Sequence, residues 1–188
     1  HFFVVPAAGG TERQLTSGDF NFSGTPQWTK DGKGLIFSGN LNEEWEYDFR
    51  NSEIYHLNIA TGEINALTDR NGPDRSPVIS PDGKKILYTG YDDRVQTYQV
   101  SKVYLMNLDG SGKEEVMLGL DRSPSSLTWS ADGKGFYFMY DDFGNTRIGF
   151  HQFKGSKTRE IAQSVGGTSL GRPYGGGSYS LATNGLIA

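Results

Sequence analysis

The sequence contains no cysteine, which excludes disulfide bonds and thiol chemistry. This absence is compatible with the bacterial cytoplasm and with the periplasm, so the compartment stays open. No apolar run approaches the roughly 18 residues of a membrane-spanning helix, and the net charge of −4 shows no basic excess. We therefore expect neither a membrane nor a nucleic acid as a partner.

Helix signals are also scarce, because no stretch shows a sustained i, i+3, i+4 apolar pattern with helix caps. Two residue types that suit short strands and tight turns are abundant instead: glycine, with 26 residues, and aromatic residues, at 13% of the chain. The composition therefore predicts an all-β chain that is nearly free of helices.

A short motif, Ser/Thr-x-Asp-Gly between two apolar runs, recurs along the whole chain. Its acidic or amide positions are 51, 50 and 52 residues apart, at Asp31, Asp82, Asp132 and Asn184. The glycine that follows each of them supplies the positive φ that a short hairpin loop with a bulge requires. The run after the turn, such as 35–37, is apolar at consecutive positions, which is typical of a strand covered on both faces.

A second hairpin follows each motif, so that four antiparallel strands make one unit of about fifty residues. A repeat of this length with four strands is typical of β-propeller blades. We expect one propeller segment over residues 1–188, with three whole blades and a half-blade at each end. The expected half-blades are 2–16 and 178–188, and the expected whole blades are 25–68, 76–118 and 126–162.

The two half-blades are complementary, and the sequence leaves three arrangements open. They could pair within one chain to give a four-blade ring, or between two chains to give a homodimer. They could also stay open as part of a larger propeller, with exposed strand edges that tend to recruit partners.

One residue position in the repeat, three before the Asp or Asn of the turn, recurs as a large apolar side chain. We expect it to form the core between blades. Its occupants are Trp28, Ile79, Trp129 and Leu181.

The repeats resemble those of a known family. Leu15-Thr16, the stretch 28–33 and the stretch 80–84 are similar to the repeats of TolB-like propellers, which are shared by the N-terminal propeller of prolyl oligopeptidase-family serine peptidases. More particular stretches resemble the bacterial acylaminoacyl- and dipeptidyl-peptidase-like members. They are 67–74, 90–93, 120–123, 140–146 and 171–178.

In that family the propeller caps an α/β-hydrolase domain and restricts entry to short peptides. The resemblance implies that this chain is the non-catalytic part of a serine peptidase, with its own hydrolase domain and a peptide substrate as partners and no cofactor. The alternative is a TolB-like scaffold that binds a partner protein on its loops or in its tunnel.

The stretch 167–171 matches G-x-S-x-G, the nucleophile motif of α/β-hydrolases. That motif needs a strand before it, a helix after it, and Asp and His later in the chain. Here Arg172 and Pro173 follow, then Tyr174 and three glycines, and no histidine comes after His151. We therefore expect a loop at this place and no catalytic residue in the chain.

Carboxylates cluster in the loops that should emerge on one face of the propeller. We expect most of them to be solvated or paired with arginine: Asp74, Arg75, Asp92, Asp93, Asp121, Arg122, Asp141 and Asp142. A sharper hypothesis concerns the tandem Glu43-Glu44 in the insertion 41–52. Some dipeptidyl members hold the peptide amine with neighbouring glutamates, and the resemblance implies that role for this pair.

No metal site is expected. The oxygen-rich stretch 69–74 lacks the terminal bidentate Glu of a calcium loop. The three histidines, His1, His56 and His151, lack the clustered spacing that a metal needs.

Overall fold

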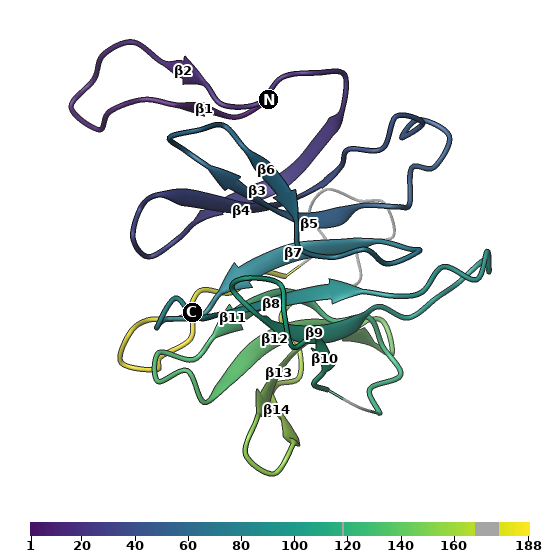
Figure 1. The fold of residues 1–188 in the computed structure, drawn as a ribbon. Helices are drawn as coiled ribbons and strands as arrows, with labels where there is room; N and C mark the ends of the chain where they lie inside the picture. Colours follow the sequence, from purple (N-terminus) through teal and green to yellow (C-terminus); the bar gives the residue numbers. More distant parts are fainter. Residues whose placement is uncertain (118, 168–176) are drawn as a thin grey trace.

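The computed structural model describes residues 1–117, 119–167 and 177–188, and strands are the only regular elements among them (Figure 1). The strands are β1 (Phe3–Val4), β2 (Arg13–Gln14), β3 (Asn21–Trp28), β4 (Gly34–Asn40), β5 (Glu53–Asn58), β6 (Ile64–Ala66), β7 (Asp74–Ile79), β8 (Lys85–Gly90), β9 (Lys102–Asn107), β10 (Glu114–Glu115), β11 (Ser125–Trp129), β12 (Gly135–Asp142), β13 (Asn145–Gln152) and β14 (Lys157–Ala162). No helix in these residues has the length and apolarity to cross a membrane.

The strands form one two-stranded and three four-stranded antiparallel sheets. The four-stranded sheets have the orders β3-β4-β5-β6, β7-β8-β9-β10 and β11-β12-β13-β14, and we number them first, second and third in this order. The two-stranded sheet is the hairpin of β1 and β2. Each sheet uses strands consecutive in the chain, and Figure 1 shows the sheets stacked in chain order. The predicted all-β propeller segment of four-stranded antiparallel blades is confirmed in the described residues.

The recurring Asp-Gly motif forms the turn between the first and second strand of each four-stranded sheet. In the second sheet Ser80 Oγ donates to Asp82 Oδ1 over 2.6 Å, and Asp82 Oδ1 accepts from the backbone N–H of Lys84. Thr29 with Asp31 and Ser130 with Asp132 repeat this pattern. The motif is thus explained by turn formation alone.

Connections between strands lie at two opposite ends of the sheets. One end, the turn face, carries the Asp-Gly turns. The other end, the loop face, carries the connections 41–52, 67–73 and 91–101, and the described residues 116–117 and 119–124 of the connection after β10. Contacts between different connections, such as the ion pair of Arg50 with Asp93, show that they share this end. The expectation that the acidic loops emerge on one face therefore holds for these connections.

The core lies between the stacked sheets. Strand β4 is buried at all seven positions, as the consecutive apolar run predicts for a strand covered on both faces. Separate apolar clusters join the β1–β2 hairpin to the first sheet, the first sheet to the second, and the second to the third.

The expectation of a core position before each turn is wrong for Trp28. Ile79 packs in the cluster between the first two sheets, and Trp129, 8% exposed, packs between the second and third. Trp28 is 53% exposed, because the short β1–β2 hairpin provides no inner strands against which it could pack. Leu181 is half-buried and bridges Ile187 in the final hairpin.

Candidate functional site on the loop face

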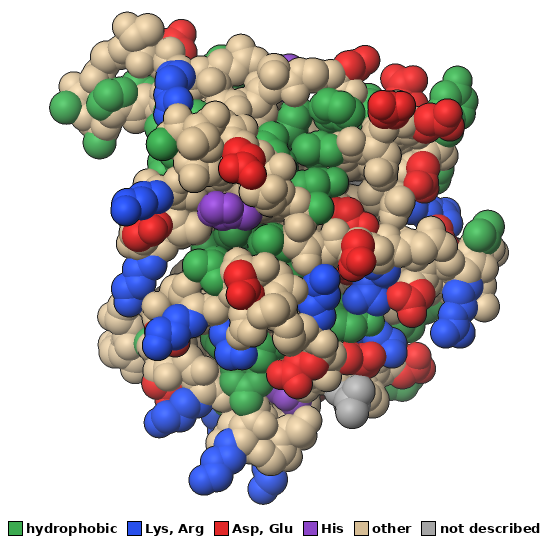
Figure 2. Space-filling view, in the orientation of Figure 1, with side chains coloured by type: hydrophobic (Ala, Val, Ile, Leu, Met, Phe, Trp, Pro, Cys, Tyr) green, Lys and Arg blue, Asp and Glu red, His purple; other side chains and the backbone are tan. Residues whose placement is uncertain are grey.

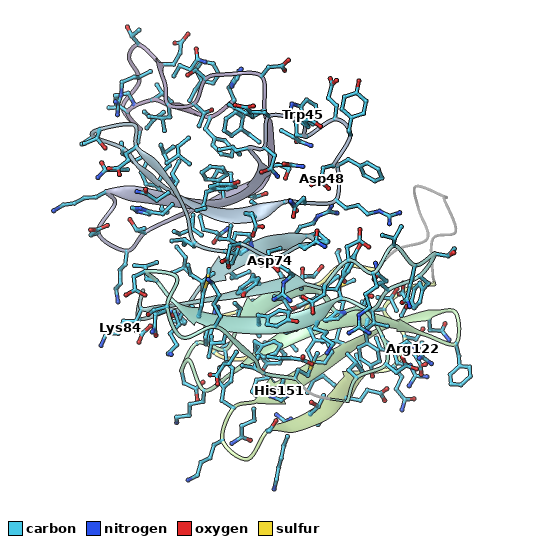
Figure 3. All side chains as sticks on the ribbon, turned by 45° about the vertical axis from the view of Figure 1, so that its right-hand side comes forward. Trp45, Asp48, Asp74, Lys84, Arg122 and His151 are labelled. Carbon is cyan, nitrogen blue, oxygen red and sulfur yellow. The ribbon has the colours of Figure 1, made fainter. Side chains whose placement is uncertain are left out.

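A buried polar cluster lies where the first and second sheets meet the loop face. We call it the Arg70 cluster. It consists of Glu53, Thr68, Arg70, Asp74, Tyr88 and Tyr104. Figure 3 shows Asp74 well inside the stack of sheets, whereas Asp48 lies on the projecting 41–52 connection.

Arg70 is the centre of the cluster. Its Nε donates to Asp74 Oδ1 over 2.9 Å, and its Nη1 donates to Asp92 Oδ1 over 2.7 Å and to the Tyr104 hydroxyl over 3.1 Å. The guanidinium carbon also lies 4.1 Å from the centroid of the Tyr104 ring, in cation–π geometry. One arginine therefore joins the connection 67–73 to strands β7 and β9 and to the connection 91–101.

Two carboxyl groups of the cluster are buried and hold their protons unusually tightly. Asp74 is 1% exposed, and burial raises its pKa to about 6, although Arg70 opposes the shift. Glu53 is 8% exposed, and burial, reinforced by the charge of Asp74, raises its pKa to about 7. Thr68 Oγ1 donates to Glu53 Oε2 and accepts from the backbone N–H of Ile54. The cluster can therefore change its charge near neutral pH.

Tyr88 completes the cluster from β8. Its ring is fully buried and stacked on Tyr104 at a centroid distance of 5.4 Å. Its hydroxyl has no hydrogen-bond partner among the described residues. Burial, with the nearby charge of Asp74, raises the pKa of this hydroxyl, so Tyr88 stays neutral.

Comparison of the repeats shows that the acidic pair is not part of the general blade design. At the position of Glu53 the neighbouring units carry His1 and Lys102, and at the position that the strand register gives for Asp74 they carry Phe22 and Pro124. Thr68 does have an equivalent, since Thr16 Oγ1 accepts from the N–H of Phe2 over 2.8 Å, just as Thr68 does from Ile54. The Thr position thus belongs to the fold, whereas Glu53 and Asp74 are particular to one junction.

Backbone contacts hold the neighbouring connections together. The N–H of Asp93 donates to the carbonyl of Asn71 over 2.8 Å, and the N–H of Gly72 donates to Asn51 Oδ1 over 3.3 Å. Gly72 has a φ of 144°, and a Cβ there would overlap the carbonyl oxygen of Tyr91. Three connections of the loop face are therefore locked at one point that only glycine fits.

Glu43 and Glu44, the predicted amine-binding pair, are exposed on the 41–52 connection. This connection is anchored by Trp45 Nε1, which donates to the carbonyl of Asp19 over 2.8 Å, and by Asn40 Nδ2, which donates to that of Asp48. Figure 2 shows acidic side chains gathered at this corner of the molecule. The pair lies outside the Arg70 cluster.

The predicted Asp–Arg pairing also occurs at the third sheet. Arg122 Nη2 lies 3.1 Å from Asp142 Oδ1, and Arg147 Nη2 lies 3.3 Å from Asp142 Oδ2. Asp141 Oδ1 instead accepts from the Thr146 hydroxyl. Arg75, from the same predicted set, donates to Ser52 Oγ rather than to a carboxylate.

No metal-binding group of three or more His, Asp or Glu side chains occurs in the described part of the chain. Within 69–74, Asp74 binds Arg70, and Asp69 lies 3.4 Å from Lys113 Nζ. Nor does a hydrogen bond join a histidine to a serine or a carboxylate in that part; His151 Nδ1 contacts Thr158 Oγ1. Of the G-x-S-x-G stretch, only Gly167 belongs to the described residues.

Sequence comparison relates the chain to two kinds of protein. It is 32% identical over 97 residues to the Tol-Pal system protein TolB of Francisella tularensis, which covers 50% of this chain and 19% of the relative. It is 33% identical over 134 residues to dipeptidyl-peptidase 5 of Aspergillus fumigatus, which covers 63% of this chain and 18% of the relative. The chain thus spans about a fifth of the length of each, and no family model matches it.

Solved structures agree on the fold. TolB from Acinetobacter baumannii superposes with a TM-score of 0.71 at 22% identity, over 98% of this chain and 41% of that one. Puromycin hydrolase superposes with a TM-score of 0.69 at 14% identity, over 96% of this chain and 30% of that one. The resemblance to TolB-like repeats and to peptidase propellers is therefore confirmed.

Proposed function

We propose that this chain is the non-catalytic propeller part of a serine peptidase, and that it limits the access of short peptides to an α/β-hydrolase domain outside these 188 residues. The observation that carries the proposal is the 33% identity to dipeptidyl-peptidase 5 over 134 residues, the longer of the two sequence matches. In this account the nucleophile, base and acid lie in the hydrolase domain.

The geometry of the loop face supports a filter. A filter must keep its shape when a long peptide presses against it, and the connections 41–52, 67–73 and 91–101 are joined by the Arg50–Asp93 and Arg70–Asp92 ion pairs and by the Gly72 contact. Backbone bonds and close packing at Gly72 add to these ion pairs, which are worth little individually where exposed.

The test uses the full-length protein and a series of chromogenic peptides that share one scissile bond and differ in length. We expect kcat/KM to fall steeply as peptide length increases. For N-acetylated peptides, which do not use the proposed Glu43–Glu44 contact, we expect kcat/KM of the long members to recover when 42–50 is replaced by a short Gly-Ser linker. An equal kcat/KM for all peptide lengths, measured on protein whose serine reacts with a fluorophosphonate, would contradict a filtering role.

Glu43 and Glu44 are the proposed contact for the peptide amine. Two observations support this assignment. Both side chains are exposed on a connection that Trp45 anchors, and two adjacent carboxylates attract a cationic group at short range. The Arg70 cluster lies deeper, and we assign it the role of fixing the loops rather than that of touching substrate.

The second candidate is a TolB-like scaffold that binds a partner protein. It is favoured by the 32% identity to TolB over 97 residues. The full-length protein separates the two: a scaffold has no serine that reacts with a fluorophosphonate, whereas a peptidase does.

A further inference from the structure

A large cavity lies at the opposite end of the sheets from the loop-face site. It has a volume of about 910 Å³ and opens at the turn face between the second sheet and the third. Both of its walls come from complete four-stranded sheets, β7–β10 and β11–β14. A volume of this size is within the range of small-molecule sites in proteins.

His151 on β13 lines this cavity and is an exception within the repeat. The register of the sheets places it at the position of Leu57 and Met106, which are fully buried apolar residues. His151 is itself 1% exposed, and burial lowers its pKa, so the imidazole is neutral. Packing alone would be served by Leu or Met at this position.

The two ring nitrogens of His151 differ. Nδ1 lies 2.8 Å from the hydroxyl of Thr158. Nε2 is buried, and no described residue forms a hydrogen bond of acceptable geometry with it, although the carbonyl of Val116 is near enough to raise the pKa of the ring. A buried polar atom without a partner is costly, so it marks a place where a ligand can supply a hydrogen bond.

The cavity also offers an aromatic wall. Trp129 and Phe153 lie with ring centroids 5.4 Å apart at an angle of 47°, and Leu105 adds apolar surface. The indole N–H of Trp129 already donates to the carbonyl of Val78 over 2.9 Å. Only apolar and π surface therefore remains here, which suits a planar ring.

The rim of the cavity carries lysines whose charge is not neutralised by an ion pair within 4 Å in the described chain. Three lysines line the rim: Lys30, Lys84 and Lys85. Lys30 Nζ donates to the carbonyl of Pro81, and Lys85 Nζ donates to Asn107 Oδ1.

Most rim carboxylates are already engaged. Asp132 pairs with Lys134 and Glu115 pairs with Lys102. Asp82 accepts from its own turn, and the charges of Lys84 and Lys30 contribute to lowering its pKa without forming an ion pair. Glu114 is the fourth carboxylate that lines the rim. With the partner lysines Lys102 and Lys134 counted, five lysines stand against four carboxylates at this rim, so it carries a small positive excess that favours an anion.

We propose that this cavity binds a small hydroxyaryl carboxylate. The ring packs on Trp129 and Phe153, the carboxylate faces Lys84 and Lys85, and the hydroxyl exchanges a hydrogen bond with Nε2 of His151 (Figure 3 labels Lys84 at the turn face and His151 deeper in the stack). The site is independent of the loop face and of the proposed peptidase role.

The test titrates the full-length protein with three probes by calorimetry: 3-(4-hydroxyphenyl)propionate, its neutral amide, and 3-phenylpropionate, which lacks the hydroxyl. We expect the first to bind about 3- to 10-fold more tightly than either of the others, the range of one net hydrogen bond or one partly screened ion pair.

Two variants assign the two ends of the ligand. His151→Met introduces the side chain that Met106 provides at the equivalent position of the second sheet. It should abolish the difference in affinity between 3-(4-hydroxyphenyl)propionate and 3-phenylpropionate. Lys84→Gln/Lys85→Gln changes only exposed side chains and should remove the advantage of the carboxylate. Lys33→Gln, at the equivalent place in the first sheet, is the control and should change nothing. Absence of saturable binding to about 5 mM, or discrimination unaltered in the lysine variant, would overturn the proposal.

Discussion

Arg70 Nε lies 2.9 Å from Oδ1 of Asp74, a carboxylate that is 1% exposed, while Nη1 of the same guanidinium lies 2.7 Å from Asp92, whose side chain is 67% exposed. One arginine thus holds one carboxylate in the interior and another at the surface. Because breaking a buried pair leaves an uncompensated charge, whereas an exposed pair is screened by water, the two contacts should differ in energy.

The first prediction compares these two partners. Asp74→Ala should lower the free energy of unfolding by about 3 kcal/mol, and Asp92→Ala by less than about 1 kcal/mol. Urea denaturation at pH 7 measures both. Equal decreases in the free energy of unfolding would show that the buried ion pair stabilises the fold no more than the exposed one.

The second prediction concerns Glu53 and pH. Its pKa is raised from 4.5 to about 7, so the folded state binds the proton more tightly than the unfolded chain does. The stabilisation it provides is fully present below about pH 4.5 and is lost as the pH rises through 7. Glu53→Gln removes this titration and should therefore gain stability relative to the parent between pH 5 and 8, by up to about 3 kcal/mol.

The measurement is the free energy of unfolding of both proteins across that pH range. Glu63→Gln, at an exposed position of the same blade, is the matched control and should follow the parent curve. Parallel curves for Glu53→Gln and the parent would contradict a raised pKa.

The third prediction tests the locking point of the loop face. Gly72→Ala would force a Cβ into the carbonyl of Tyr91 in a left-handed backbone conformation, whereas Gly62→Ala has a φ of 76° with no atom within 4 Å. Gly62→Ala should cost about 1 kcal/mol and Gly72→Ala at least about 3 kcal/mol. Thermal unfolding distinguishes them, and similar midpoints would show that the connections are not tightly joined at Gly72.

The fourth prediction concerns the tandem glutamates in the full-length protein and rests on the proposed peptidase function. Glu43→Gln/Glu44→Gln should raise KM for free-amine peptides about tenfold or more and leave KM for N-acetylated peptides unchanged, since only the former carry a cation. Glu46→Gln is the control on the same connection. An unchanged KM for the free-amine series would remove the assignment.

Much of the fold could be predicted from the sequence, because the determinants of a blade are local. The Asp-Gly turns and the consecutive apolar residues of β4 act within one hairpin, and their spacing repeats. Trp28 departs from the pattern because its burial depends on what the preceding sheet offers, and the β1–β2 hairpin has only two strands.

The Arg70 cluster could not be predicted in the same way. The sequence places Asp74 among loop carboxylates that are expected to be solvated, and its burial depends on Arg70, Tyr88 and Glu53, which come from different strands and connections. The available signal was positional: Glu53 and Asp74 stand where the other units carry no acid. His151 gives the same signal, a polar residue at a position that otherwise holds Leu57 and Met106.

The central claim is that chemistry resides outside this propeller segment. Labelling of the full-length protein with a fluorophosphonate, followed by mass spectrometry of the modified peptide, tests it most directly. The account predicts one labelled serine beyond residues 1–188. A label on Ser169 or any other serine of this segment, or no label at all, would contradict it.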